Sequence, residues 1–198
     1  MTRYLLAFPL MLAPLGVQAV DLANGEQINR ACALCHGIYG QGTPGRLSPR
    51  LAGLRQEYMV KAIKEYRDGK RISPTMVSTS GLDHMNEDDI NDVAAYLAQM
   101  KVPGDALIDV MQPQGNREAG QEFYEEECKT CHREDGTGKP DKGVPPLNGQ
   151  HAAYVFQTIK MFQWHKRVHD DDPEDDTFDD LSEEDLYNLT AHLATLDD

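Results

Sequence analysis

The chain has 198 residues, and 33 acidic against 19 basic side chains give it a formal net charge of −14. A surplus of this sign excludes nucleic acid as a partner, because proteins that bind the phosphate backbone do so with clustered lysine and arginine. The length is sufficient for one large domain or two small ones.

Residues 1–19 have the features of a secretory signal peptide. Arg3 precedes an apolar run from Tyr4 to Val17, and Val17-Gln18-Ala19 is a small-residue cleavage signal. A retained membrane anchor is the alternative, but the apolar run is shorter than the roughly 20 residues that a spanning helix needs. We therefore expect export from the cytoplasm with cleavage near Ala19.

All four cysteines lie in two copies of one motif. Cys32-Ala33-Leu34-Cys35-His36 and Cys128-Lys129-Thr130-Cys131-His132 both have the pattern C-x-x-C-H, the attachment sequence of c-type haem. Residues three and four positions apart share a helix face, so both sulfurs can bond the haem while the imidazole ligates its iron. A zinc site or two disulfides would also use C-x-x-C pairs, but neither needs the following histidine. The motifs predict two covalently bound haem c groups.

The two motifs belong to an internal repeat with an offset of 96 residues. Seven residues after the first motif recur after the second without a gap: Gly40, Gly42, Pro44, Pro49, Leu51, Gly53 and Tyr58 match Gly136, Gly138, Pro140, Pro145, Leu147, Gly149 and Tyr154. Such a repeat indicates two copies of one domain. Turn signals between the copies place an N-terminal domain at 20–102, a linker at 103–116 and a C-terminal domain at 117–198.

Helical patterns fill each copy, and no strand-like alternation stands out. In the first copy we expect helices over 25–35, over 56–67 and from Asn86 onwards; in the second, over 120–131, over 152–164 and from Ser182 onwards. A glycine- and proline-rich loop follows the first helix of each copy. The predicted fold class is all-α. Because copies of about 80 residues are marginal for an unaided core, we expect the haem to supply apolar volume in each.

These residues resemble the class I cytochromes c, and in particular the di-haem cytochrome c4 family. The likeness covers almost all of the chain after residue 19 and includes Cys-Ala-Leu-Cys-His-Gly, Pro-Arg-Leu-Ala-Gly-Leu and Tyr-Met-Val-Lys-Ala-Ile-Lys-Glu-Tyr-Arg-Asp-Gly-Lys-Arg. It implies a tandem pair of small domains related by a pseudo-two-fold axis, which transfer electrons in the bacterial periplasm. It also implies that the carbonyls of Pro49 and Pro145 accept hydrogen bonds from Nδ1 of His36 and His132, which leaves Nε2 for the iron.

The resemblance further implies a methionine as the sixth iron ligand, between the middle and last helices. Met76 stands there in the first copy, with Met85 as its competitor. The repeat places Met85 on Leu181, which marks it as a core position. Met76 is therefore the predicted ligand, although it lies two residues further from the last helix than the family pattern has it.

The second copy has no methionine in this segment, and Asp172 stands at the position of Met76. Two histidines are nearby. His169 lies in the predicted loop, whereas His165 lies at the end of the middle helix, where it could instead complement the helix dipole. We expect His169 to be the sixth ligand of the C-terminal haem, with His165 or an open iron as the alternatives.

The net negative charge comes from residues 105–198. Residues 20–104 carry ten acidic and ten basic side chains, whereas residues 105–198 carry 23 acidic and 8 basic ones. Segment 170–185 is rich in carboxylates and contains neither lysine nor arginine. This segment is either a solvated loop or a surface that steers a basic redox partner to the C-terminal domain.

The expected function is electron transfer between redox proteins, with peripheral association at a membrane-bound oxidase or reductase, and no catalytic residue is assigned. The alternative is a small haem enzyme, or the electron-accepting subunit of one, with the C-terminal haem as its substrate-binding or entry site. Di-haem thiosulfate dehydrogenases use a cysteine as a distal ligand, and the two motifs leave no cysteine for that role.

Overall fold

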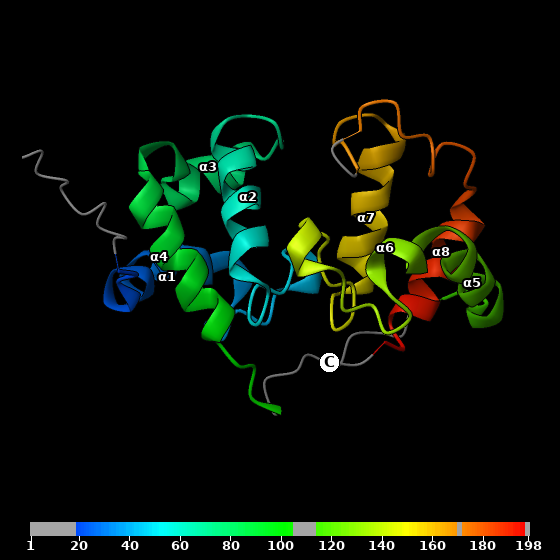
Figure 1. Cartoon of the computed structure of the whole chain (residues 1–198), viewed down its shortest axis with the longest axis horizontal. Helices are drawn as coiled ribbons and strands as arrows, with labels where there is room; N and C mark the ends of the chain where they lie inside the picture. Colours follow the sequence, from blue (N-terminus) through cyan, green and yellow to red (C-terminus); the bar gives the residue numbers. More distant parts are fainter. Residues whose placement is uncertain (1–18, 105–113, 170–171, 197–198) are drawn as a thin grey trace, which may run out of the picture.

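The computed structural model describes residues 19–104, 114–169 and 172–196. Within these ranges the regular secondary structure is helical, with isolated β-bridges but no strand. Two helical bodies lie side by side, the first coloured blue to green and the second yellow-green to red in Figure 1. The predicted all-α class is confirmed. Residues 1–18 of the predicted signal peptide and residues 105–113 of the predicted linker lie outside the described residues.

The helices of the two halves correspond in part. The first half has α1 (Leu22–His36), α2 (Gln56–Arg67), α3 (Pro74–Ser80) and α4 (Glu87–Gln99); the second has α5 (Arg117–Phe123), α6 (Lys129–His132), α7 (Ala152–Gln163) and α8 (Glu183–Leu193). Helices α1, α2 and α4 of the first half correspond to α5–α6, α7 and α8 of the second, and α3 has no helical counterpart among the described residues. A π-helical segment, Tyr124–Cys128, joins α5 to α6. Helices α2 and α7 flank the junction of the halves (Figure 1). None of the described helices is long and apolar enough to cross a membrane.

The last helix of each half begins with a capping box. The side chain of Asn86 accepts a hydrogen bond from the backbone N–H of Asp89, whose carboxylate accepts one from the N–H of Asn86. Ser182 and Asp185 make the same pair of bonds at the start of α8. Because each cap satisfies two N–H groups that the helix leaves unpaired, it fixes where the helix begins.

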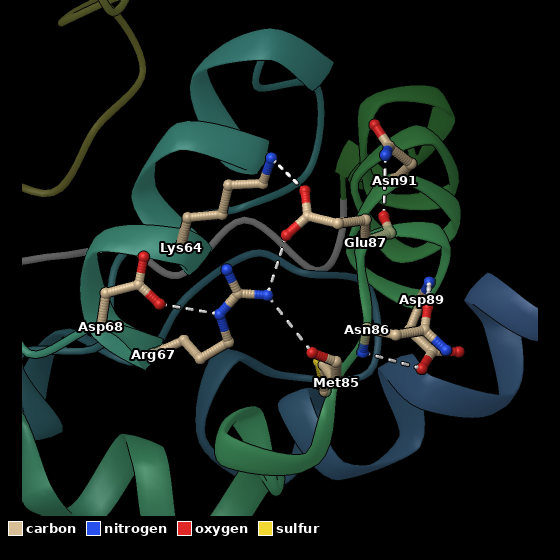
Figure 2. Close-up of polar contacts among 8 residues, drawn as sticks. All are labelled: Lys64, Arg67, Asp68, Met85, Asn86, Glu87, Asp89 and Asn91. Carbon is tan, nitrogen blue, oxygen red and sulfur yellow. Dashed lines mark hydrogen bonds and ion pairs between the residues drawn. The ribbon is translucent and has the colours of Figure 1, made fainter.

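Helix α4 is also joined to the end of α2 by charged side chains. Figure 2 shows Glu87 of α4 between Lys64 and Arg67 of α2. The Arg67 guanidinium lies 3.0 Å from the Glu87 carboxylate, and its Nε lies 2.9 Å from Asp68. Exposed pairs of this kind contribute at most about 1 kcal/mol each, so they fix the register of the two helices more than they stabilise the fold.

The first and last helices of each half cross at a glycine. Helix α1 packs on α4, and α5 packs on α8. A Cβ on Gly25 would lie 2.3 Å from the backbone oxygen of Asp92, and one on Gly120 would lie 2.0 Å from that of Asn188. Both distances are far below van der Waals contact, so the helix backbones can approach this closely only at glycine.

The second half has one residue more than the first between this crossing and its C-x-x-C-H motif. Gly25 precedes Cys32 by seven positions, whereas Gly120 precedes Cys128 by eight. One extra residue in a regular α-helix would turn the motif by about 100°. The π-helical segment Tyr124–Cys128 takes up that residue, so the glycine and the motif keep equivalent orientations in both halves.

We predict that Gly120→Ala destabilises the C-terminal half by about 1–3 kcal/mol, because the added methyl group forces α5 and α8 apart. Denaturant unfolding of the haem-loaded protein should show a lower midpoint for that half. Gly45→Ala is the control, since a Cβ at Gly45 has open space and the residue has no positive φ. Equal midpoints for the two variants would contradict the close crossing.

Candidate haem sites

One continuous cavity of about 650 Å³ runs through both halves and reaches both C-x-x-C-H motifs. Its apolar walls come from the middle and last helices: Met59, Ile63, Val93 and Leu97 in the first half, and Val155, Ile159, Leu189 and Leu193 in the second. The same residues belong to the hydrophobic core of their half. The core of each half is therefore built around the cavity, as expected if a large apolar group completes it.

The four cysteines are free thiols, and all of them line the cavity. Burial raises the pKa of Cys32 to about 11 and that of Cys128 to about 12, which keeps both thiols neutral at physiological pH. Within the described ranges no three His, Cys, Asp or Glu side chains are arranged to hold a metal ion. The two sulfurs and the following histidine of each motif lie on the cavity wall, which fits thioether attachment to haem.

The histidine of each motif is buried and has a fixed orientation. His36 Nδ1 donates a hydrogen bond to the carbonyl oxygen of Pro49 at 2.8 Å, and His132 Nδ1 donates one to that of Pro145 at 3.0 Å. These are the two bonds that the resemblance implies. Burial lowers the pKa of His36, although its bond to Pro49 acts in the opposite direction. A neutral ring with Nδ1 occupied has its Nε2 lone pair free for iron.

Met76 and Met85 both line the first half of the cavity. Met76 lies in α3, a short helix that is not predicted from the sequence. In Figure 2, Met85 lies just before α4, and its carbonyl oxygen accepts a bond from Arg67 at 3.3 Å. Gln163 makes the equivalent bond to the carbonyl of Leu181 at 2.8 Å. Met85 therefore occupies the place that a leucine fills in the second half, as the repeat indicates.

His169 lies opposite His132 in the second half of the cavity. The ring centroids are 6.4 Å apart and the ring planes differ by 23°. Both rings line the same cavity, and imidazole is a common iron ligand, so these two histidines could hold a haem iron between them. His165 is placed differently: its side chain is 63% exposed and lies 3.6 Å from Asp179. The structure therefore distinguishes the two candidate histidines: His169 lies on the cavity wall, whereas the His165 side chain lies mostly in solvent.

The His169 ring is held on three sides. Phe162 and Phe178 pack against it, with ring centroids 5.1 and 4.9 Å away. Its Nδ1 donates a hydrogen bond to Oδ2 of Asp175, and the other oxygen of that carboxylate accepts two bonds from Thr177. Burial alone would raise the pKa of Asp175, but the hydrogen bonds outweigh it and the pKa lies below its ordinary value. Asp175 is thus a carboxylate when it binds His169.

Asp175 is not singled out by the sequence, where it is one of many carboxylates in 170–185. Its side chain is only 13% exposed, so it does not belong to a solvated acidic surface. The pattern Asp175-Asp176-Thr177 could have indicated a local turn, since an aspartate often accepts bonds from the residue two positions later. Nothing in this pattern indicates that Asp175 also binds His169, six positions earlier in the chain.

Two equivalent arginines meet where the halves join. Arg71 and Arg167 are related by the repeat, and both contact the half-buried Tyr58. Burial raises the pKa of Tyr58, but the charges of Arg167 and Arg71 outweigh it and bring the pKa below its ordinary value. Arg71 forms an ion pair with Glu65, and the Nε atoms of both arginines are buried without a hydrogen-bond partner. The surplus of positive charge at this place could pair with the carboxylates of haem propionates.

Direct hydrogen bonds also join the halves. The side-chain amide of Gln150 accepts a bond from the N–H of Arg50 at 2.9 Å and donates one to its carbonyl oxygen at 3.1 Å. His151 Nε2 donates to the carbonyl oxygen of Gln41 at 2.7 Å. The two haem sites therefore belong to one connected unit.

Comparisons with known proteins agree with this geometry. The cytochrome c family model matches residues 22–101 and 117–197. Cytochrome c4 of Pseudomonas aeruginosa is 30% identical over 197 residues, which cover 96% of each chain. A thiosulfate dehydrogenase electron acceptor of Stutzerimonas stutzeri is 32% identical over 73% of this chain and 68% of its own. The crystal structure of reduced cytochrome c4 from Pseudomonas stutzeri has a TM-score of 0.73 at 25% identity, over 90% of this chain and 100% of that one.

A helical fold with one C-x-x-C-H motif on the cavity wall of each half defines a c-type cytochrome. The chain belongs to the cytochrome c family, as a cytochrome c4-like electron-transfer protein with two covalently bound haem c groups. Each haem, when bound, supplies an iron that cycles between the ferric and ferrous states.

Proposed function

We propose that this protein is exported to the periplasm and carries single electrons between redox proteins through two haem centres of unequal potential. Residues 1–19 support the export. The proposed ligands of the first haem are Cys32, Cys35, His36 and Met76, and those of the second are Cys128, Cys131, His132 and His169, with Pro49 and Pro145 orienting the two proximal histidines. The observation that carries the proposal is the pair of imidazoles on the cavity wall, His132 and His169, whose ring centroids lie 6.4 Å apart.

The difference in axial ligands sets the order of the two potentials. A methionine ligand raises the potential of a haem relative to a second imidazole. Net negative charge near the second site acts in the same direction as its imidazole ligand, because it stabilises the ferric state. Electrons then enter at the C-terminal haem and leave from the N-terminal one.

A second candidate is the electron-accepting partner of a dehydrogenase. Two relatives, from Stutzerimonas stutzeri and Thiomonas intermedia, are each named thiosulfate dehydrogenase electron acceptor. This role uses the same two haem centres and the same direction of electron flow, and it differs from a free carrier only in the identity of the donor. Reduction of the protein by a purified dehydrogenase of this kind, without a mediator, would distinguish it.

We predict that His169→Ala changes the lower of two separate waves in a redox titration and leaves the upper wave in place. The reduced variant should also bind carbon monoxide, because one axial position becomes open. His165→Ala is the matched control and should change neither wave. If the unmutated reduced protein already binds carbon monoxide, the second iron is open and the enzyme becomes the better assignment.

Met76→Ala should abolish the charge-transfer absorption of a methionine–ferric bond and lower the upper potential. Met85→Leu is the control, because leucine occupies the equivalent place in the second half. Absorption that survives in Met76→Ala and disappears in Met85→Leu would show that Met85 is the ligand.

The acidic half is proposed to bind a basic redox partner. With a cationic cytochrome c as the probe, the association rate should fall steeply with ionic strength, since salt screens exposed charges beyond about 8 Å. Neutralising the exposed Glu174, Asp176 and Asp180 should flatten that dependence. Neutralising Glu57, Asp83 and Asp88 of the first half should not. Equal effects of the two triple variants would show that the net charge of the whole molecule, and not an acidic surface on the second half, sets the association rate.

A further inference from the structure

The hydrogen bonds to the two facing imidazoles of the second site are chemically different. His132 donates to a neutral backbone carbonyl, that of Pro145. His169 donates to the carboxylate of Asp175. A carboxylate accepts hydrogen bonds more strongly than a neutral oxygen, and a metal-bound histidine with a carboxylate partner becomes a more basic ligand.

The Asp175 carboxylate is fixed before it contacts the histidine. Its Oδ1 accepts bonds from the N–H of Thr177 at 3.0 Å and from the Thr177 hydroxyl at 2.5 Å. Its Oδ2 remains for His169, and the rings of Phe162 and Phe178 prevent the imidazole from tilting away. With Nδ1 bound to Asp175, Nε2 is the ring nitrogen left for a metal, and the held ring has little freedom left to lose on ligation.

The first half has no counterpart of this carboxylate. The repeat places Thr79 at the position of Asp175, and that residue lies in α3 with Met76. A methionine side chain has no N–H or O–H group that could donate a hydrogen bond to a carboxylate. The acidic partner therefore occurs only in the half where a histidine replaces the methionine.

We propose that Asp175 is the positioning residue of the second haem site: its carboxylate selects the His169 tautomer that points Nε2 at the iron, and it strengthens that ligand. The inference rests on the proposed ligation by His169. It assigns to Asp175 two effects, a lower potential at the C-terminal haem and an axial position that stays closed to small molecules.

The test compares Asp175→Asn, Asp175→Ala and Glu174→Gln in the haem-loaded protein. Asparagine keeps an oxygen that can accept the Nδ1 bond but removes the charge, whereas alanine removes both. Glu174→Gln removes a charge one residue away, on an exposed side chain. The measurements are the two reduction potentials and carbon monoxide binding by the reduced protein. The upper wave reports whether the rest of the molecule is intact.

Asp175→Asn should raise the lower potential by the equivalent of about a tenfold change in the ferric/ferrous ratio, which is about 59 mV for one electron. Glu174→Gln should shift it by less than a third of that amount, and the upper wave should stay in place. Asp175→Ala should also let the reduced second haem bind carbon monoxide. Equal shifts in Asp175→Asn and Glu174→Gln would overturn the proposal, because Asp175 would then contribute only its share of a general field.

His169→Ala, measured alongside, separates this inference from the assignment on which it rests. If His169→Ala changes the lower wave while Asp175→Asn behaves like Glu174→Gln, the ligand assignment stands and the role of Asp175 is refuted. If His169→Ala changes neither the lower wave nor carbon monoxide binding, the ligand assignment fails and the role of Asp175 fails with it.

Discussion

Each half of the molecule depends on the contact of two helix backbones at a glycine. At Gly25 and Gly120 no side chain separates the first helix from the last, and this contact fixes the direction in which the C-x-x-C-H motif faces. The middle helix then closes the opposite wall, so that the apolar side chains of the core surround a cavity. A half of about 80 residues is marginal for an unaided core, and the side chains of each half leave this cavity open. The fold is therefore an incomplete core that the covalently attached haem finishes.

The parts of this structure that depend on local signals are predictable from the sequence. The motifs, the 96-residue repeat and the helix at Gln56–Arg67 are all recognisable from short patterns, and the predicted bounds of that helix agree with the structure. The π-helical segment is not predictable in this way, because it arises from a mismatch between two distant contacts on one helix. The role of Asp175 is hidden for a similar reason, since its partner is chosen by the shape of a loop. The predicted signal peptide and domain boundaries stay predictions.

The two halves differ most in the segment between the middle and last helices. The fold explains why this segment can vary. The core of each half comes mainly from the helices, and in the second half Phe178 is the one buried apolar residue that the described part of this segment contributes. Axial ligand, loop conformation and charge can therefore change together without disturbing the glycine crossing or the motif. The same scaffold holds α3 with Met76 in one half and His169 with Asp175 in the other.

The π-helical segment Tyr124–Cys128 also shows how the two halves diverged. A single codon gained or lost in one copy of a duplicated gene would ordinarily misalign everything after it, yet here the local under-winding of one turn absorbs the change. Residues after this turn correspond at an offset of 96, whereas the helix start before it corresponds at 95. Chimaeras that exchange material between the halves can therefore be joined residue for residue downstream of the turn. A junction upstream of it must carry the turn along, or the haem-bearing end of the helix will face the wrong way.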